Sequence, residues 1–172
     1  MAEVSQITDS FRKSVAIDIQ PWFKDHFFAG RMILPGVETL LILADAAKGC
    51  KPDCDVGRMV DVRFDKILQI DPSETRLEVL VEIESTDTDS ITAKLLTKSR
   101  KKAFSRILEH GRGTFFATSL PIVRAQAAQM PIDLAGAVIK VTSKKIYQEL
   151  VPFGKAYQNI IDTLFLSEQG AW

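Results

Sequence analysis

The apolar residues of this chain follow a helical period in one segment and a strand period over most of the rest. Within residues 36–48, apolar side chains recur every three or four positions, which predicts a helix. Further apolar residues, such as Ile42 and Ala46, occupy the other faces of this helix, so it must be wrapped by the rest of the protein. Three of its side chains are therefore expected to be nearly inaccessible to solvent: Leu40, Leu43 and Ala47.

Strand-like alternation of apolar and polar residues is found on both sides of the predicted helix. A strand around residues 15–19 precedes the helix, and four long strands follow it at residues 58–70, 75–84, 90–99 and 102–118. Short polar turns join these four strands, so we expect them to be antiparallel. One buried helix and a long antiparallel sheet indicate the hot-dog fold, an α+β architecture in which the sheet wraps around the helix.

Composition and charge exclude several classes of protein. The chain has 172 residues, 46% of them hydrophobic, which is enough for one substantial core. Its 22 basic and 22 acidic side chains cancel, and this argues against a protein that binds nucleic acid or an anionic membrane. The longest apolar stretch, residues 32–47, is shorter than the roughly 20 residues that span a bilayer. No secretion signal is predicted at the N-terminus.

Two cysteines, Cys50 and Cys54, favour a reducing, cytoplasmic location. Together with His26 and His110 they would make four metal ligands. Zinc sites of this type use short spacings within both ligand pairs, however, and the two histidines lie far apart in the sequence. We therefore interpret the cysteines as ordinary small side chains beside a turn, and we predict neither a metal nor a cofactor.

The strongest candidate for chemistry is His26. It follows an aromatic run, and a glycine, Gly30, comes four residues later. Pro35 comes nine residues after the histidine and opens the predicted helix. An imidazole titrates near neutral pH, and the N-terminus of a helix stabilises negative charge. The spacing thus brings a proton acceptor close to a site that favours an anion.

These residues carry a family resemblance. The pattern Pro-Trp-x-x-Asp-His-x-x-x-Gly-x-x-x-x-Pro-Gly, residues 21–36, resembles the first-half motif of polyketide synthase dehydratase domains. Such domains are double hot-dogs that remove water from β-hydroxyacyl chains on an acyl carrier protein. Residues 146–158 are similar to the segment that opens the family's second hot-dog. Three residues depart from that segment, because Phe153, Lys155 and Tyr157 replace its usual Tyr, Pro and Phe.

The resemblance implies roles for individual residues. His26 corresponds to the base that abstracts the α-proton of the thioester. The family's acid is an aspartate on the helix of the second hot-dog, and no segment before Trp172 matches it. Stand-alone relatives use a glutamate six residues after the motif proline, where this chain has Leu41. The substrate-binding residues implied are Gly30, Pro35, Gly36, Phe153, Gly154 and Tyr157.

The resemblance also implies how the chain is divided. We expect a hot-dog domain over residues 1–118, a linker over 119–142 and the start of a second, incomplete hot-dog over 143–172. In the last part, Ser143 is expected to cap a short helix, and residues 159–166 have the pattern of an apolar strand. Such a strand without its hairpin partner invites pairing with another chain. A homodimer, or pairing with a second hot-dog, is therefore expected.

The function that follows is dehydration of β-hydroxyacyl thioesters, carried by an acyl carrier protein or by CoA, with His26 as general base. Dehydration needs an acid as well as a base, and only the base is assigned. Two alternatives therefore remain: a non-catalytic acyl-binding or assembly module of a synthase, and a hot-dog thioesterase in which Glu38 or Asp45 directs a water. The basic run at residues 98–102 is either a solvated hairpin tip or a docking patch for an acidic carrier protein.

Overall fold

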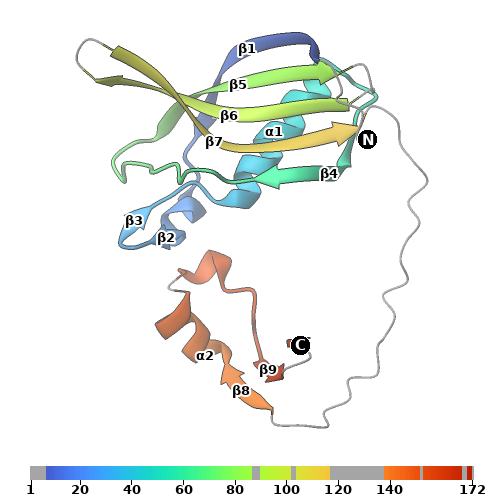
Figure 1. Ribbon diagram of the computed structural model, residues 1–172. Coiled ribbons are helices and arrows are strands. Elements are labelled where there is room, and N and C mark those ends of the chain that lie inside the picture. The colour runs from blue at the N-terminus through green and yellow to red at the C-terminus, as the bar shows by residue number, and fades with distance from the viewer. Residues whose placement is uncertain are drawn as a thin grey trace.

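The computed structural model describes residues 7–86, 90–101, 104–116, 138–151, 153–167 and 170–171. Five of the strands form one antiparallel sheet in the order β1-β5-β6-β7-β4. A single long helix, α1 (Gly36–Cys50), lies against one face of this sheet, which curves around it (Figure 1). The strands are β1 (Ile7–Asp18), β4 (Asp55–Arg63), β5 (Arg76–Thr86), β6 (Ser90–Lys101) and β7 (Phe104–Phe116). The hot-dog fold expected from the sequence is therefore confirmed.

Helix α1 begins and ends where the sequence chemistry requires. Pro35, with φ −61°, cannot donate a backbone hydrogen bond, but its carbonyl accepts one from the N–H of Thr39 at 3.0 Å. At the other end, the N–H of Lys51 donates to the carbonyl of Ala47 at 2.9 Å, and Pro52 follows. The helix extends two residues beyond the predicted end at Lys48.

The apolar surface of α1 is covered on only part of its circumference. Leu43 and Ala47 are fully buried, as predicted. The prediction is wrong for Leu40, which is only partly buried. Val37 and Leu41, four residues apart on the helix, are 66% and 56% exposed. The helix is therefore covered on the side that faces the sheet. The expectation that it is covered all round is wrong near its N-terminus, where Val37 and Leu41 are exposed.

The core lies between α1 and the inner face of the sheet. Alternate residues of β5 point inward and are buried, namely Val79, Val81 and Ile83. They belong to one core cluster with Leu43 of α1, Leu95 of β6 and Phe115 of β7. Burial of one such side chain contributes about 1.5–3 kcal/mol. Because alternate residues of a strand point to the same face, the period of two in the sequence determines which face of the sheet packs against α1.

One predicted strand is half wrong. The sequence predicts a strand over residues 58–70, but β4 ends at Arg63 and the chain leaves the sheet there. Residues 68–70 pair instead with residues 32–34, through hydrogen bonds from Leu34 N–H to the Leu68 carbonyl (2.8 Å) and from Ile70 N–H to the Met32 carbonyl (2.9 Å). Leu68 and Ile70 are buried at alternate positions, as in a strand. The period of two is therefore real, but it does not tell which segment is the partner.

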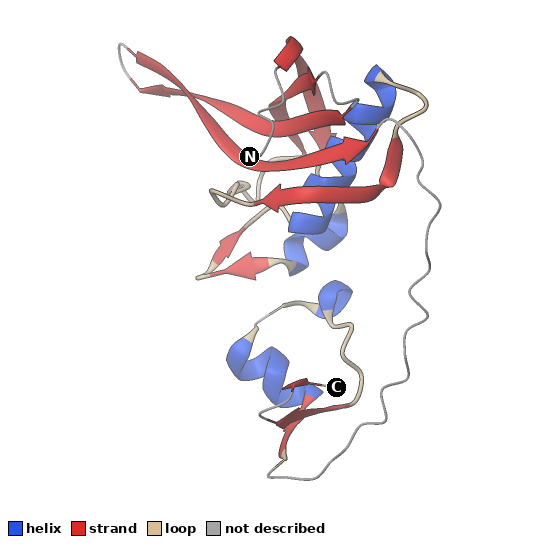
Figure 2. Ribbon diagram, turned by 45° about the vertical axis from the view of Figure 1, so that its right-hand side comes forward, coloured by secondary structure: helices blue, strands red, loops and turns tan. Residues whose placement is uncertain are grey.

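The C-terminal segment, residues 138–171, forms a second, smaller sheet in the order β10-β9-β8 (Figure 2). Of the apolar strand predicted over residues 159–166, only the part from Thr163 is present, as β9 (Thr163–Ser167). The sequence did not predict β8 (Ile139–Thr142), which pairs with β9 and lies at the end of the expected linker. Thr142, and not Ser143, caps the following helix, since its hydroxyl accepts from the N–H of Lys145 at 3.3 Å. The remaining elements are α2 (Ser143–Lys145), η2 (Ile146–Leu150), η3 (Lys155–Tyr157) and β10 (Gly170–Ala171).

The helices among the described residues are all too short or too polar to cross a lipid bilayer.

Candidate active site

His26 lies directly after a short helical turn, η1 (Pro21–Asp25). Its backbone N–H donates to the carbonyl of Phe23 at 3.0 Å, and its own carbonyl accepts from the N–H of Ile33 at 3.1 Å. The chain reverses between these two residues through the hairpin of β2 (Phe27–Phe28) and β3 (Arg31–Met32). The backbone of His26 is therefore held on both sides.

The hairpin turn explains Gly30. Ala29 and Gly30 have φ values of 49° and 73°, the left-handed conformation that two-residue hairpins require. Glycine adopts this conformation without steric strain. Gly30 is exposed, and nothing lies within 4 Å of the position where its Cβ would be. The structure thus places Gly30 in the turn that returns the chain past His26, and not on the cavity described next.

A cavity of about 240 Å³ lies beside His26. Both histidines of the chain line it, together with the first turn of α1 and the chain after β4. The first turn of the helix contributes Gly36 and Thr39, while Pro35 itself is fully buried. The remaining lining is mostly apolar, with Phe64 and Leu68 on one wall. Leu41 does not line this cavity.

The imidazole of His26 is half-buried. Burial lowers the pKa of His26 below its ordinary value of 6.5, and an interaction with the backbone of Ile33 opposes this in part. Its Nδ1 atom is buried and has no hydrogen-bond partner among the described residues. At neutral pH the side chain is therefore uncharged, and it is able to accept a proton.

Two aromatic rings from the C-terminal segment cover His26. The ring centre of Phe153 lies 4.5 Å from that of His26, and the ring of Tyr157 meets it edge-on at 5.1 Å. The hydroxyl of Tyr157 is buried without a partner among the described residues. Burial, followed by the charges of Glu38 and Asp25, raises the pKa of Tyr157 to about 12. The phenol therefore stays protonated.

Asp25 connects the two parts of the site. Its backbone carbonyl accepts from the N–H of Gly154 at 2.7 Å, and its carboxylate accepts from the N–H of Ala156 at 2.9 Å. These bonds bring Phe153, Gly154 and Tyr157 to His26. The structure thus assembles the two motifs that the sequence placed more than a hundred residues apart.

His110 is the second histidine of the cavity, and it is 7% exposed. Its Nδ1 lies 3.3 Å from the carbonyl oxygen of Lys66, and its Nε2 lies 2.8 Å from the hydroxyl of Thr97. A carbonyl only accepts, so Nδ1 carries the hydrogen and Nε2 accepts from Thr97. Burial lowers the pKa of His110, in agreement with this neutral form. No pattern in the sequence placed His110 beside His26.

The carboxylates on α1 lie elsewhere. Glu38 and Asp45 line a different cavity of about 360 Å³, between α1 and β1, to which His26 does not contribute. The indole N–H of Trp22 donates to Glu38 at 3.1 Å. Neither of the two candidate acids for a thioesterase, Glu38 or Asp45, therefore lines the cavity beside His26.

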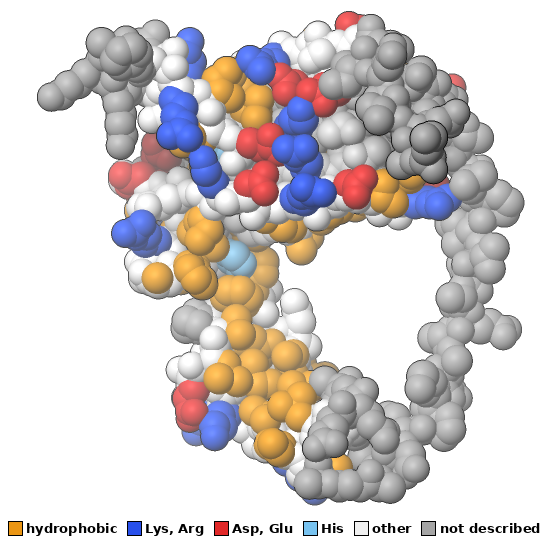
Figure 3. Space-filling view, viewed as in Figure 1, with side chains coloured by type: hydrophobic (Ala, Val, Ile, Leu, Met, Phe, Trp, Pro, Cys, Tyr) orange, Lys and Arg blue, Asp and Glu red, His pale blue; other side chains and the backbone are white. Residues whose placement is uncertain are grey.

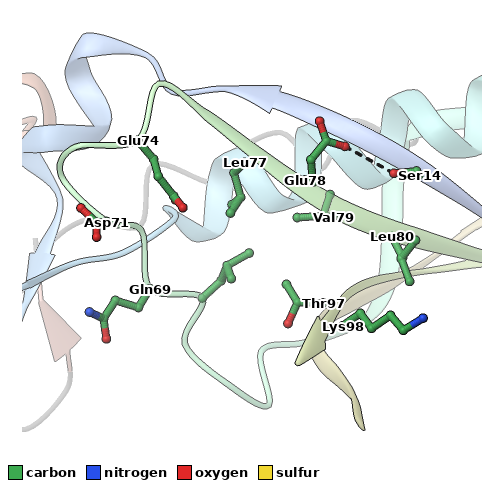
Figure 4. A pocket seen from close by; sticks show the side chains of 11 residues that line it. Ser14, Gln69, Asp71, Glu74, Leu77, Glu78, Val79, Leu80, Thr97 and Lys98 are labelled. Carbon is green, nitrogen blue, oxygen red and sulfur yellow. Dashed lines mark hydrogen bonds between the residues drawn. The ribbon is translucent and has the colours of Figure 1, made fainter. Parts of the chain in front are cut away.

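Another cavity, of about 600 Å³, lies at the start of β5, and neither histidine lines it (Figure 4). Its polar side chains include Asp71, Glu74 and Glu78, and Ser14 donates a long hydrogen bond of 3.4 Å to Glu78. None of the side chains that line it has a buried nitrogen or oxygen atom without a hydrogen-bond partner, as His26 has. Among the described residues no cluster of His, Cys, Asp and Glu side chains is arranged to hold a metal ion.

An antiparallel sheet curved around one helix, with a half-buried histidine beside the N-terminus of that helix, places this chain among the hot-dog proteins. The sequence model of the polyketide synthase dehydratase domain matches residues 2–98, which is more than half of the chain. The chain therefore belongs to the polyketide synthase dehydratase family. No curated protein is similar enough in sequence to count as a relative.

Solved structures agree with this fold. The dehydratase domain from the CurF module of curacin polyketide synthase superposes with a TM-score of 0.73 at 17% identity, over 99% of this chain and 62% of that one. A trans-AT polyketide synthase dehydratase domain from Brevibacillus brevis gives 0.64 at 18% identity, over 95% of this chain and 59% of that one. The chain thus spans about three fifths of the length of these domains.

Proposed function

We propose that this chain contributes the base of a dehydratase that removes water from β-hydroxyacyl thioesters. The observation that carries this proposal is His26 itself, a neutral, half-buried imidazole beside a cavity and the N-terminus of α1. His26 takes the proton from the carbon between the thioester carbonyl and the hydroxyl-bearing carbon. The electrons form the new double bond, and the hydroxyl leaves as water after it accepts a proton.

The first turn of α1 suits the developing enolate. Thr39 is the first residue whose N–H has an acceptor within the turn, the carbonyl of Pro35. The N–H groups of the residues before it, beginning with Gly36, have no such acceptor, and the helix dipole is positive here. A thioester oxygen placed at this end of the cavity accepts these hydrogen bonds, which stabilise the enolate and make the α-proton easier to remove.

The leaving hydroxyl also needs an acid. Among the described residues that line the cavity there is no carboxylate. We therefore assign the proton donor to a group outside the described residues, corresponding to the family's aspartate. The substrate in this proposal is an acyl chain bound through a thioester to an acyl carrier protein or to CoA, and the apolar walls at Leu34 and Leu68 suit the acyl carbons.

The test is His26→Gln in a protein that contains the complete dehydratase. We expect the rate of water loss from a 3-hydroxyacyl thioester to fall by about 100-fold or more, the range for a lost general base, while circular dichroism stays the same. Glu38→Gln is the matched control and is expected to retain activity. An unchanged rate in His26→Gln would refute the dehydratase assignment.

The same assay separates the alternatives. A non-catalytic acyl-binding or assembly module would bind the thioester without turnover, both before and after the substitution. Hydrolysis of the thioester that depends on Glu38 or Asp45 would indicate a thioesterase, because only that reaction needs a carboxylate to direct water at the carbonyl.

A further inference from the structure

We propose that Asp25 is a positioning residue that holds residues 153–157 over His26, and that this cover keeps the imidazole out of water. The proposal rests on the proposed function only where it treats His26 as the base. The contacts that support it are independent of any activity.

The first support is that Asp25 holds the cover at two points. Its carbonyl and its carboxylate bind two N–H groups two residues apart, those of Gly154 and Ala156. The carboxylate bond joins residues 131 positions apart in the sequence. Because the acceptors belong to the main chain and the side chain of a single residue, the bound turn has a fixed orientation as well as a fixed position.

The second support is the shape of the contact at Gly154. A Cβ at this position would lie 2.4 Å from both the Cγ and the Oδ1 of Asp25, which is far inside normal contact. Gly154 has φ −68° and ψ 176°, a conformation open to any residue. Glycine is therefore required here by the space that Asp25 occupies, and not by the backbone. The two residues fit each other closely.

The third support is what lies on either side of these bonds. Phe153 precedes Gly154 and Tyr157 follows Ala156, and these are the two rings that contact the imidazole. The rings also meet each other edge-on at 6.0 Å. Fixing the backbone between them therefore fixes both rings against His26. Release of the turn would open the half-buried imidazole to water.

Loss of the cover and loss of the Asp25 charge would shift the pKa of His26 in opposite directions. Asp25 is negative and adjacent in sequence to His26, so by charge alone its removal would disfavour the protonated imidazole and lower the pKa of His26. By loss of the cover, its removal would hydrate the imidazole and raise the pKa of His26 toward 6.5. The other titratable groups around the site are Lys66 and His110 across the cavity, and Glu38 and Tyr157. The substitutions below leave all of these in place.

The experiment is an NMR titration of the imidazole in Asp25→Ala and Gly154→Ala. The chain has two histidines, so the spectrum of His26→Gln assigns the signals. We expect the pKa of His26 to rise toward 6.5 in both variants and the exchange of the Gly154 and Ala156 amides to accelerate at least tenfold. Matched controls are Asp53→Ala, in the exposed turn after α1, and Gly49→Ala, where a Cβ meets only an ordinary contact of 3.8 Å.

A conservative variant completes the test. In Asp25→Asn the amide oxygen still accepts from Ala156, so we expect the amides to remain protected and the pKa of His26 to stay below 6.5. A fall of the pKa in Asp25→Ala with no change in Gly154→Ala would show that Asp25 acts only as a charge and would overturn the proposal. Unchanged amide exchange in both variants would overturn it as well.

Activity is measured separately, so that the two proposals fail separately. In the complete dehydratase, kcat/KM falls on the acid side of its pH profile as the base becomes protonated. We expect the midpoint of this fall to move to higher pH in Asp25→Ala and Gly154→Ala, by the same amount as the pKa of His26. If the NMR shift occurs but the midpoint does not follow it, the positioning role stands and the assignment of His26 as the base fails. If the NMR shift is absent, the positioning role fails whatever the activity.

Discussion

The hydroxyl of Thr97 donates to Nε2 of His110 over 2.8 Å, and this bond fixes a neutral imidazole beside the candidate base. The other ring nitrogen of His110 donates to the carbonyl of Lys66. One side chain thus connects β6, β7 and the segment after β4 that walls the cavity. A protonated His110 would no longer accept from Thr97, so its charge state is linked to the stability of this wall.

The first prediction concerns stability against pH. Burial lowers the pKa of both His26 and His110 in the folded chain, so the unfolded chain binds more protons below about pH 6.5. The free energy of unfolding is therefore expected to be highest above pH 6.5. It is expected to decrease as the pH falls from 6.5 through the lowered pKa values that the two histidines have in the folded chain. The pKa values of the Glu82 and Asp71 carboxyls are lowered from 4.5 and 3.8, so these two groups titrate below this window. Urea unfolding between pH 7.5 and 5.5 measures the effect, and a flat profile would contradict it.

The second prediction concerns the core. Leu43 is fully buried in α1, whereas Leu41, two positions earlier, is 56% exposed. Leu43→Ala is expected to lower the free energy of unfolding by about 2–5 kcal/mol through lost burial and a residual cavity. Leu41→Ala is the control and is expected to change it by less than about 0.5 kcal/mol in a monomer. Equal effects in denaturant unfolding would contradict the burial of Leu43 and the exposure of Leu41.

The third prediction concerns a charge cluster on the outer face of the sheet. Lys94 contacts Glu84 and lies 3.4 Å from Glu82, which Arg12 also contacts. Lys94→Met would leave two poorly solvated carboxylates without this partner, at a cost of about 3 kcal/mol in unfolding free energy. Lys98→Met, at an exposed position farther along β6, is the control, with less than about 0.5 kcal/mol expected. Thermal or urea unfolding of the two variants decides the matter.

Local patterns in the sequence explain the elements but not all of their partners. The periods of three to four and of two correctly predict α1 and four strands of the main sheet. They fail after Arg63, because Leu68 and Ile70 alternate like strand residues while pairing with residues 32–34. Periodicity reports which side of a segment is buried, and it carries no information about what buries it.

The candidate site shows the same division. His26 follows from local spacing, and the resemblance adds Phe153, Gly154 and Tyr157. The hairpin turn at Gly30 was not predicted. The contact between Asp25 and Ala156 spans 131 positions, and the hydrogen bonds of His110 come from two further segments. Such contacts depend on how the chain returns to itself, which no single stretch of sequence encodes.

The fourth prediction concerns association. Among the described residues, β8 lies at the edge of the C-terminal sheet and pairs only with β9. Exposed apolar side chains also lie on α1, at Val37 and Leu41, and Figure 3 shows hydrophobic side chains gathered from the region below the main sheet to the C-terminal segment. Unpaired strand edges and apolar patches of this kind mark interfaces. We therefore expect a homodimer at micromolar concentration, measured by light scattering, and a monomer at that concentration would contradict the prediction.

The two kinds of contact make different predictions for variants. If the apolar face of α1 is buried between two copies, Leu41→Glu places a charge in the interface and is expected to shift the dimer toward monomer by at least tenfold in dissociation constant. Ile107→Glu, at a 42% exposed position near the tip of the β6–β7 hairpin, is the matched control and is expected to leave the dimer intact. If the edge of β8 alone holds the dimer, both variants remain dimeric, since neither residue lies in the C-terminal sheet. Light scattering of these two variants therefore identifies the surface as well as the oligomeric state.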